Sequence, residues 1–321
     1  RPEVHGVRQT SWGGAVHFHD GRWHMWSAEL GHGCPMEFWL ANSQVMHSVS
    51  ANVTGPFERK EVVHSVFAHE PNTVRGPNGE FVMYFTATPA GHPPPNVEGR
   101  QCVCVGGHAV NNCSGNRNWS VPLLTYMAWT ADPFGPWSDP VPIPQESPMI
   151  DTNFAPVIHA DGSLRGLFRD DGRNNDPAHK NIHIVTASNW KDPATYVERD
   201  GPIAPAFEAP EDPFVWQDGE GNYHALFHEW PHAAGPHAFS IDGERWHYAA
   251  TPPDAAGLCR VACGYGPTLT VVGAFGGVRN ISLTARERPH LVFPPGGTEP
   301  VALTNGACST TDRTDCWTSL Q

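Results

Sequence analysis

Residues 211–229, EDPFVWQDGEGNYHALFHE, contain two strand-like runs separated by a Gly-containing turn. Aromatic and apolar residues fill both runs, which is the pattern of a tight β-hairpin. Comparable hairpins with Asp-Gly or Asn-Gly turns recur along the chain, at residues 13–29 (GGAVHFHDGRWHMWSAE), 70–87 (EPNTVRGPNGEFVMYFTA) and 153–170 (NFAPVIHADGSLRGLFRD). This self-similarity predicts a repeat architecture whose unit begins with a hairpin.

A second hairpin follows the first in most copies, at residues 40–57, 127–137, 185–196 and 237–246. Two consecutive hairpins make a four-stranded antiparallel unit, which is a propeller blade. A fifth, less regular unit follows. The sequence therefore predicts an all-β, five-bladed β-propeller that forms one domain over residues 1–321, with approximate blades at 11–60, 68–140, 150–200, 210–250 and 264–306. We expect the chain start to complete a blade with the chain end, which would close the ring without exposed edges.

Composition agrees with this architecture and restricts the partners. Charged residues make up only 17%, and Gly and Pro number 32 each, which favours short strands and turns over long helices. No apolar run approaches the roughly 18 residues that span a bilayer. The net charge of −13 argues against nucleic acid and anionic membranes as partners. We expect a monomer.

Cysteines and glycosylation sequons indicate a secreted, extracellular glycoprotein of a eukaryote. The eight cysteines are an even number, as in disulfide-bonded proteins, and lack the paired knuckles of a zinc site. Local pairings Cys259–Cys263 and Cys308–Cys316 are expected, although spacing leaves the connectivity open. The chain opens at Arg1 without a signal-like segment and is interpreted as a mature product. Four N-x-S/T sequons begin at Asn52, Asn112, Asn118 and Asn280.

An insertion at residues 89–120 interrupts the second blade and is rich in Gly, Pro, Asn and Cys. Insertions of this length are usually functional or stapled by disulfides. A lid over the central funnel and a glycosylated surface loop both remain open.

Blade geometry brings the starts of first strands and the ends of second strands to one rim. The first-strand starts are Trp12, Glu70, Asn153, Glu211 and Asp212; the second-strand ends are Glu29, Thr86, Arg169, Asp170, His228 and Glu229; and the fifth blade adds Arg286, Glu287 and Arg288. The sequence thus predicts a dense polar set around one funnel.

Glycoside cleavage needs a proton donor and a second carboxylate across the sugar ring. Glu70, Glu211 and Asp212 supply such groups, and burial beside a like charge favours the protonated form that a general acid requires. Arg169 and Arg288, together with Arg286, could hold a sugar carboxylate or neutralise these acids. The acid-Pro pairs could alternatively serve only as turn caps.

Blade openings of the type acid-Pro, followed by a hairpin and an aromatic strand, resemble those of glycoside hydrolase family 43 and its five-bladed relatives, which include arabinanases and xylosidases. The resemblance implies an Asp base in the first blade, an Asp that tunes the acid in the third, and a Glu acid in the fourth. Glu211 matches the acid, and Asn153 or Asp151 falls at the third-blade position. Trp12 stands where the first-blade Asp is expected.

This departure leaves three functional readings. The favoured one is hydrolysis of a cell-wall or extracellular glycan at a chain end, with Glu70 replacing the missing base. The second is a polysaccharide lyase on a uronic-acid-containing glycan, with His69 abstracting a proton and an arginine neutralising the carboxylate. The third is an inactive sugar-binding propeller, with Trp12 as a stacking platform. The substrate-binding residues predicted across these readings are Trp12, His69, Asp151, Arg169, Asp170, His228, Glu229, Arg286 and Arg288.

No metal ligand set or cofactor motif is predicted, and we expect no cofactor. His17 and His19 point to one face of a strand, where ordinary packing is the favoured explanation. A structural cation in the central channel is left open.

Overall fold

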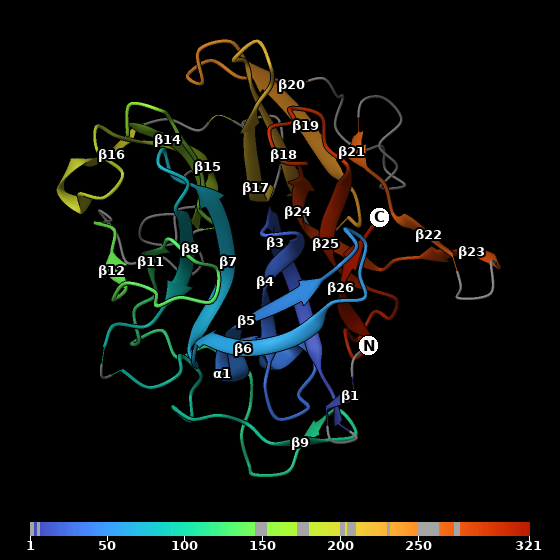
Figure 1. Ribbon diagram of the computed structural model, residues 1–321. Coiled ribbons are helices and arrows are strands. Elements are labelled where there is room, and N and C mark those ends of the chain that lie inside the picture. The colour runs from blue at the N-terminus through green and yellow to red at the C-terminus, as the bar shows by residue number, and fades with distance from the viewer. Residues whose placement is uncertain are drawn as a thin grey trace.

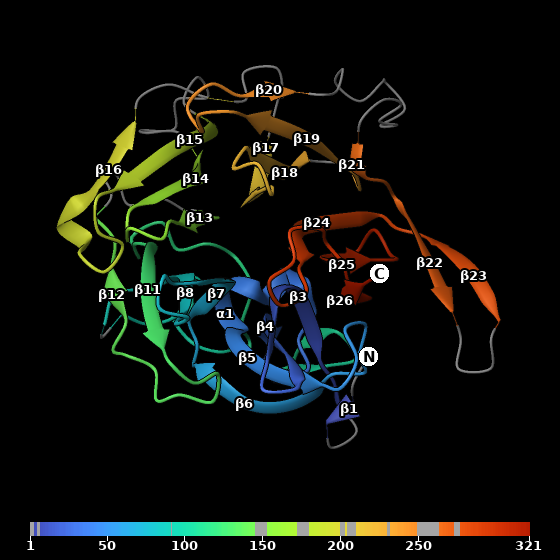
Figure 2. The same cartoon turned by 45° about the horizontal axis from the view of Figure 1, so that its top comes forward.

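The computed structural model describes residues 3–4, 7–90, 92–144, 153–171, 180–199, 203, 210–229, 232–248, 263–272 and 277–321. Five antiparallel sheets surround a common axis in chain order, and the views in Figures 1 and 2 follow them around the ring. The predicted all-β five-bladed propeller is confirmed. No helix within the described ranges is long and apolar enough to cross a membrane.

Each of the first four blades contains four strands in sequence order from the axis outward, and the sheet of blade four has one further short strand. Blade one contains β3 (Thr10–His19), β4 (Arg22–Leu30), β5 (Ser43–Ser50) and β6 (Glu58–His64). Blade two contains β7 (Ala68–Arg75), β8 (Phe81–Ala87), β11 (Leu124–Thr130) and β12 (Val141–Pro142). Blade three contains β13 (Ala155–Ile158), β14 (Leu164–Asp171), β15 (Lys180–Ala187) and β16 (Tyr196–Arg199). Blade four contains β17 (Pro210–Gln217), β18 (Tyr223–Glu229), β19 (Gly235–Ser240) and β20 (His247–Tyr248).

The fifth sheet differs from the prediction in its extent. It is built from β24 (Ala285–Val292), β25 (Ala302–Cys308) and β26 (Cys316–Leu320), so it begins later than residue 264. The preceding strands β22 (Thr268–Val272) and β23 (Val278–Ser282) pair only with each other and project from the ring as a hairpin (Figure 2).

Ring closure also differs from the prediction. The N-terminal strands β1 (Glu3–Val4) and β2 (Val7–Arg8) pair with each other, and among the described residues no N-terminal strand joins the fifth sheet. Instead, side chains of the fifth blade bond to β3: Thr304 Oγ1 donates to the carbonyl of Gly14 at 2.6 Å, and Thr318 Oγ1 to that of Gly13 at 2.8 Å. The C-terminal strand therefore lies against the first blade through side-chain bonds.

Tight turns explain why the quoted stretches form hairpins. Between β3 and β4, Asp20 and Gly21 both have positive φ, 46° and 77°, as a type I′ turn requires. The remaining short elements lie between or beside blades: η1 (Met36–Phe38), α1 (Trp39–Asn42), β9 (Cys104–Val105), β10 (His108–Ala109), η4 (Pro193–Thr195) and β21 (Cys263–Tyr265), which pairs with β19.

The hydrophobic core lies between neighbouring blades. Trp26 of blade one packs with Phe81 and Met83 of blade two, and all three are fully buried. Fully burying one such side chain stabilises the fold by about 1.5–3 kcal/mol. Because the apolar side chains are used between the sheets, the axis is left for the polar residues that open each blade.

Three disulfides are present among the described residues, and two of them fix the insertion. Cys308–Cys316 is confirmed, whereas Cys259 lies outside the described residues. Cys102–Cys113 closes the insertion on itself, and Cys34–Cys104 ties it to the loop between β4 and β5. That loop follows the β4 end that pairs with the start of β3, so the insertion lies on the rim where first strands begin. The lid remains a prediction, since no described residue of the insertion lines the funnel pocket.

Candidate active site

One residue at the opening of every blade has positive φ, and these five residues meet at the axis. They are Gly13 (62°), Glu70 (58°), Asn153 (36°), Asp212 (52°) and Arg288 (53°). In four blades a register shift of the first strand falls at this residue. A non-glycine residue in this region costs of order 1–3 kcal/mol, and such residues cluster at functional sites. The repeated strain therefore marks the mouth of the axis.

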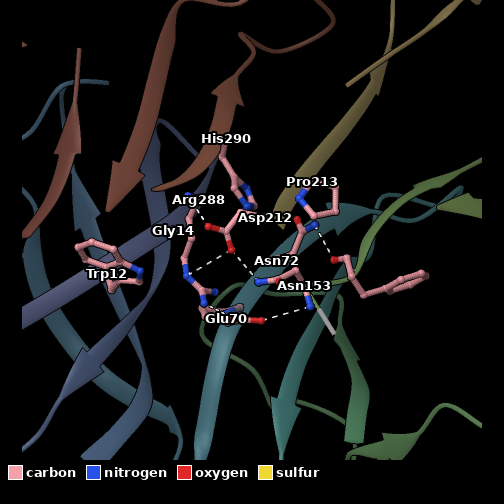
Figure 3. A pocket seen from close by; sticks show the side chains of 11 residues that line it. Trp12, Gly14, Glu70, Asn72, Asn153, Asp212, Pro213, Arg288 and His290 are labelled. Atoms are coloured by element: carbon pink, nitrogen blue, oxygen red, sulfur yellow. Dashed lines mark hydrogen bonds and ion pairs between the residues drawn. The ribbon is translucent and has the colours of Figure 1, made fainter. Parts of the chain in front are cut away.

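Arg288 bridges the two carboxylates at this mouth (Figure 3). Its Nη2 forms an ion pair with Glu70 Oε1, its Nε lies 3.8 Å from Asp212 Oδ1, and its backbone N–H donates to Asp212 Oδ2 at 3.1 Å. The side chains of the two acids are only 3% and 5% exposed. Burial lowers the pKa of Arg288 well below its usual value, but a guanidinium stays protonated in proteins. Arg288 therefore offsets part of the negative charge of the two carboxylates.

Asn153 fixes both carboxylates from the third blade. Its Nδ2 donates to Asp212 Oδ1 at 2.7 Å, and its backbone N–H donates to Glu70 Oε2 at 3.3 Å. Asn72 Nδ2 in turn donates to the carbonyl of Phe154 at 2.9 Å, which secures the start of blade three. The pocket among these residues holds about 20 Å³, which is enough for roughly one water molecule.

Glu211 belongs to an adjoining cluster, which it shares with Asp212, His228 and Glu287. Its Oε2 lies 2.8 Å from Arg169 Nη1, and its Oε1 lies 2.7 Å from His228 Nδ1. Burial acts to raise its pKa, but the hydrogen bond from His228 and the charge of Arg169 outweigh burial and lower the pKa to about 2. Its side chain is 14% exposed. The predicted acid is therefore held as a carboxylate whose proton must come from a neighbour.

His69 does not fit the role predicted for it in a lyase. It is 1% exposed and stacks on Trp39, with ring centroids 4.7 Å apart. Arg288 Nη2 donates to its Nε2 at 3.3 Å, so Nδ1 carries the proton and donates to Ser43 Oγ at 2.5 Å. Burial, with the charge of Arg288, lowers its pKa well below the usual value. Its one lone pair is thus occupied inside the protein.

Two other predicted substrate-binding residues are buried. Trp12 lies at the pocket wall but is 1% exposed, and its ring would meet any side chain placed at Gly306, so its face is not presented to a sugar. Arg286 is also 1% exposed: it donates to Asn305 Oδ1 at 2.9 Å and to the carbonyl of Gly266 at 2.6 Å. Both side chains are packed inside the fold, so we assign them structural roles in place of the predicted sugar contacts.

The remaining predicted positions are distributed as follows. Arg169 and His228 lie beside Glu211, as described above. Glu229 is buried at the end of β18. Asp151 and the side chain of Asp170 lie outside the described residues. His17 donates to the carbonyl of Thr73 at 2.6 Å, and burial lowers its pKa to about 4, which agrees with ordinary packing.

His290 and Arg313 are among the site residues that were not predicted. His290 lines the pocket, and burial together with the charges of Arg288 and His17 lowers its pKa to about 3. Arg313, from the turn between β25 and β26, forms an ion pair with Glu287. The sequence marks the opening of the fifth blade, because a proline follows Arg288 as it follows Glu70 and Asp212 at the openings of blades two and four.

Glu211, Asp212, His228 and Glu287 bring one potential ligand atom each within 4.8 Å of one another. The acids of this group already have partners within the protein: Arg169 and His228 contact Glu211, and Arg313 pairs with Glu287. We therefore assign these residues to an internal ion-pair network and not to a metal centre.

Comparison with solved structures relates the fold to glycoside hydrolases. An α-L-arabinofuranosidase from Lactobacillus brevis matches with a TM-score of 0.57 and 12% identity, over 97% of this chain and 90% of that one. A family 117 glycoside hydrolase from Zobellia galactanivorans gives 0.57 and 11%, over 97% and 83%. A GH43_1 enzyme from Xanthomonas citri, complexed with xylose, gives 0.58 and 12%, over 98% and 88%. No family model and no curated protein sequence matches. At this low sequence identity, the structural likeness shows the fold alone. It confirms the prediction that this chain has the propeller fold of family 43 and its relatives.

Proposed function

We propose that this protein is a glycoside hydrolase that acts on a cell-wall or extracellular glycan at the mouth of the propeller axis. The observation that carries the proposal is a set of carboxylates from two blades. Glu70 and Asp212 line the pocket at the strained rim, and Glu211 lies in the cluster beside Asp212. The fold shared with arabinofuranosidases and family 117 enzymes supports the same class of reaction.

The geometry suggests a division of roles. Glu211 is the most exposed of the three acids and would give a proton to the glycosidic oxygen as the bond to the anomeric carbon breaks. A water in the small pocket beside Glu70 and Asp212 would bond to the anomeric carbon and lose its proton to one of these carboxylates. Of the two, Glu70 is our choice for the base.

A second candidate function is sugar binding without turnover. Arg288 pairs with both Glu70 and Asp212, and this neutralisation weakens the basicity of the two carboxylates. An inactive propeller would tolerate such a bridge permanently, whereas an enzyme would need the sugar to shift it.

Digestion of a glycan panel, read by reducing-end release and by ultraviolet absorbance, separates these candidates. Reducing ends without absorbance would support hydrolysis, and absorbance would reveal the double bond that a lyase creates. Retained sugar binding without either signal would overturn the hydrolase proposal in favour of a binding propeller.

We also propose that the protein is secreted and glycosylated. Its disulfides are typical of oxidising compartments. The sequon asparagines Asn52, Asn112 and Asn280 are exposed, as a glycan acceptor must be. A mass decrease on treatment with a glycan-releasing amidase would test this proposal.

A further inference from the structure

His228 makes two short hydrogen bonds that together fix its protonation. It lies on β18, is 1% exposed, and contacts Glu211 through Nδ1 at 2.7 Å. Its Nε2 lies 2.8 Å from the carbonyl oxygen of His232. A carbonyl only accepts, so Nε2 must carry a hydrogen.

The second bond then requires an additional proton. A neutral histidine with hydrogen on Nε2 presents a lone pair at Nδ1, and a carboxylate also presents only lone pairs. Two acceptors at 2.7 Å would repel each other, so one proton must lie between Nδ1 and Glu211 Oε1. Turning the ring over would place carbon atoms against both partners and lose both bonds. The pair therefore holds one proton more than a neutral histidine beside a carboxylate.

The surrounding charges place this proton on histidine. Arg169 lies against the other oxygen of Glu211, and its positive charge favours the carboxylate form of Glu211. Asp212 Oδ2 lies 3.9 Å from His228 Nδ1 and adds a second negative charge. The charged or titratable groups that face the pair, by element, are Asp212 on β17, Arg169 on β14, Tyr265 on β21, Glu287 on β24 and Arg313 after β25.

We propose that His228 is held as an imidazolium between Glu211 and Asp212, and that it supplies the proton that Glu211 passes to the leaving group. The proposal deepens the proposed hydrolase function and rests on it for the second step. His228 is thus a positioning and proton-holding residue, whereas Glu211 touches the substrate.

In each step one bond to the proton breaks as another forms, and the proton moves from the buried His228 to the more exposed Glu211. The N–H bond at Nδ1 breaks as the O–H bond at Glu211 Oε1 forms, which leaves a neutral imidazole. Glu211 then gives that proton to the glycosidic oxygen, which keeps the electron pair of the broken C–O bond. His228 is buried and cannot reach a sugar directly, whereas the Glu211 side chain is 14% exposed. The base takes a proton from the attacking water. That proton later returns to His228, which restores the His228–Glu211 pair for the next turnover.

The stored proton can be measured without any activity. In protein with ¹⁵N-labelled histidine at pH 8, the His228 ring should show two N–H groups, assigned by their loss in His228→Asn. An ordinary histidine, with a pKa near 6.5, would be mostly neutral at this pH. One N–H group and one unprotonated nitrogen at pH 8 would overturn the proposal. Glu211→Gln should abolish the second N–H signal, because the carboxylate that stabilises it is gone.

Delivery of the proton can be measured with paired 4-nitrophenyl and methyl glycosides of one sugar. His228→Asn should lower kcat about 10²–10⁴-fold on the methyl glycoside, whose leaving group needs protonation, and much less on the nitrophenyl glycoside. Equal losses on both substrates would indicate structural damage and overturn the delivery step.

The matched control is His224→Asn, which breaks a histidine–aspartate contact of 3.2 Å on the same strand outside the funnel. It should leave both rates near those of the unmodified protein. If no glycoside is hydrolysed while the two N–H signals persist, the hydrolase proposal and the delivery step both fail and the stored proton stands.

Discussion

Arg288→Met removes the cation between Glu70 and Asp212 while keeping an unbranched side chain of similar length. The variant leaves two nearly buried carboxylates without their shared partner. Asp212 keeps the amide of Asn153 and the backbone N–H of residue 288. Among the described residues, Glu70 keeps the backbone N–H of Asn153 at 3.3 Å, with His69 Nε2 4.0 Å away. Glu70 should therefore account for most of the destabilisation.

Breaking a buried ion pair by removing one partner typically costs about 3–5 kcal/mol, and we expect a loss in this range at pH 7.5. The assay is guanidinium unfolding followed by tryptophan fluorescence. Protonation removes the uncompensated charge, so the deficit relative to the unmodified protein should shrink toward pH 5. Adding Glu70→Gln to the variant should recover at least half of the loss. A loss below about 1 kcal/mol at pH 7.5 would refute the charge bridge, because that is the size of an exposed pair.

Three further perturbations test other parts of the structure. The pKa values of buried His17 and His290 are lowered by burial to about 4 and about 3, so the unfolded chain binds protons more readily below pH 6.5. The contribution of these two histidines to the free energy of unfolding should be fully present above pH 6.5, and up to about 4 kcal/mol of it should be lost by pH 5. A free energy of unfolding in guanidinium that does not change over this pH range would contradict their burial. Cys34→Ser opens a disulfide that spans 70 residues and should cost about 4 kcal/mol by loop-closure entropy; thermal unfolding unchanged within 2 °C would contradict that role. Gly306→Ala places a methyl 2.5 Å from the buried Trp12 ring and should cost about 1–3 kcal/mol in the same assay, whereas a neutral effect would show that the ring can shift.

The blade repeat could be predicted because hairpin turns are encoded locally. Asp20-Gly21 and its counterparts need only neighbouring residues to set the turn, and the alternation of the flanking strands follows from it. The fifth blade was harder to locate, since β22 and β23 have a strand-like sequence but pair only with each other. Ring closure depends on contacts between residues nearly 300 positions apart, such as Thr304 with Gly14, which no local pattern encodes.

The candidate site was predicted in its residue types but not in its pairing. In blade four the bulge at the start of the first strand separates neighbouring residues: Asp212 lies at the axis, whereas Glu211 contacts His228. In blade one the axis residue is Gly13, one position after the expected Trp12. The bridge from Arg288 to Glu70 joins blades five and two, so it depends on side-chain reach across the axis.

Turnover of the glycan identified by the panel, compared between the unmodified protein and Glu211→Gln, tests the central claim most directly. Glu29→Gln is the matched control, because it alters a buried glutamate on blade one that pairs with Arg59 at 2.6 Å and lies outside the cluster of Glu211, Asp212, His228 and Glu287. We predict that Glu211→Gln lowers kcat by about 10²-fold or more while sugar affinity is retained, and that Glu29→Gln keeps kcat. Unchanged kcat in Glu211→Gln, with the protein folded, would contradict the account.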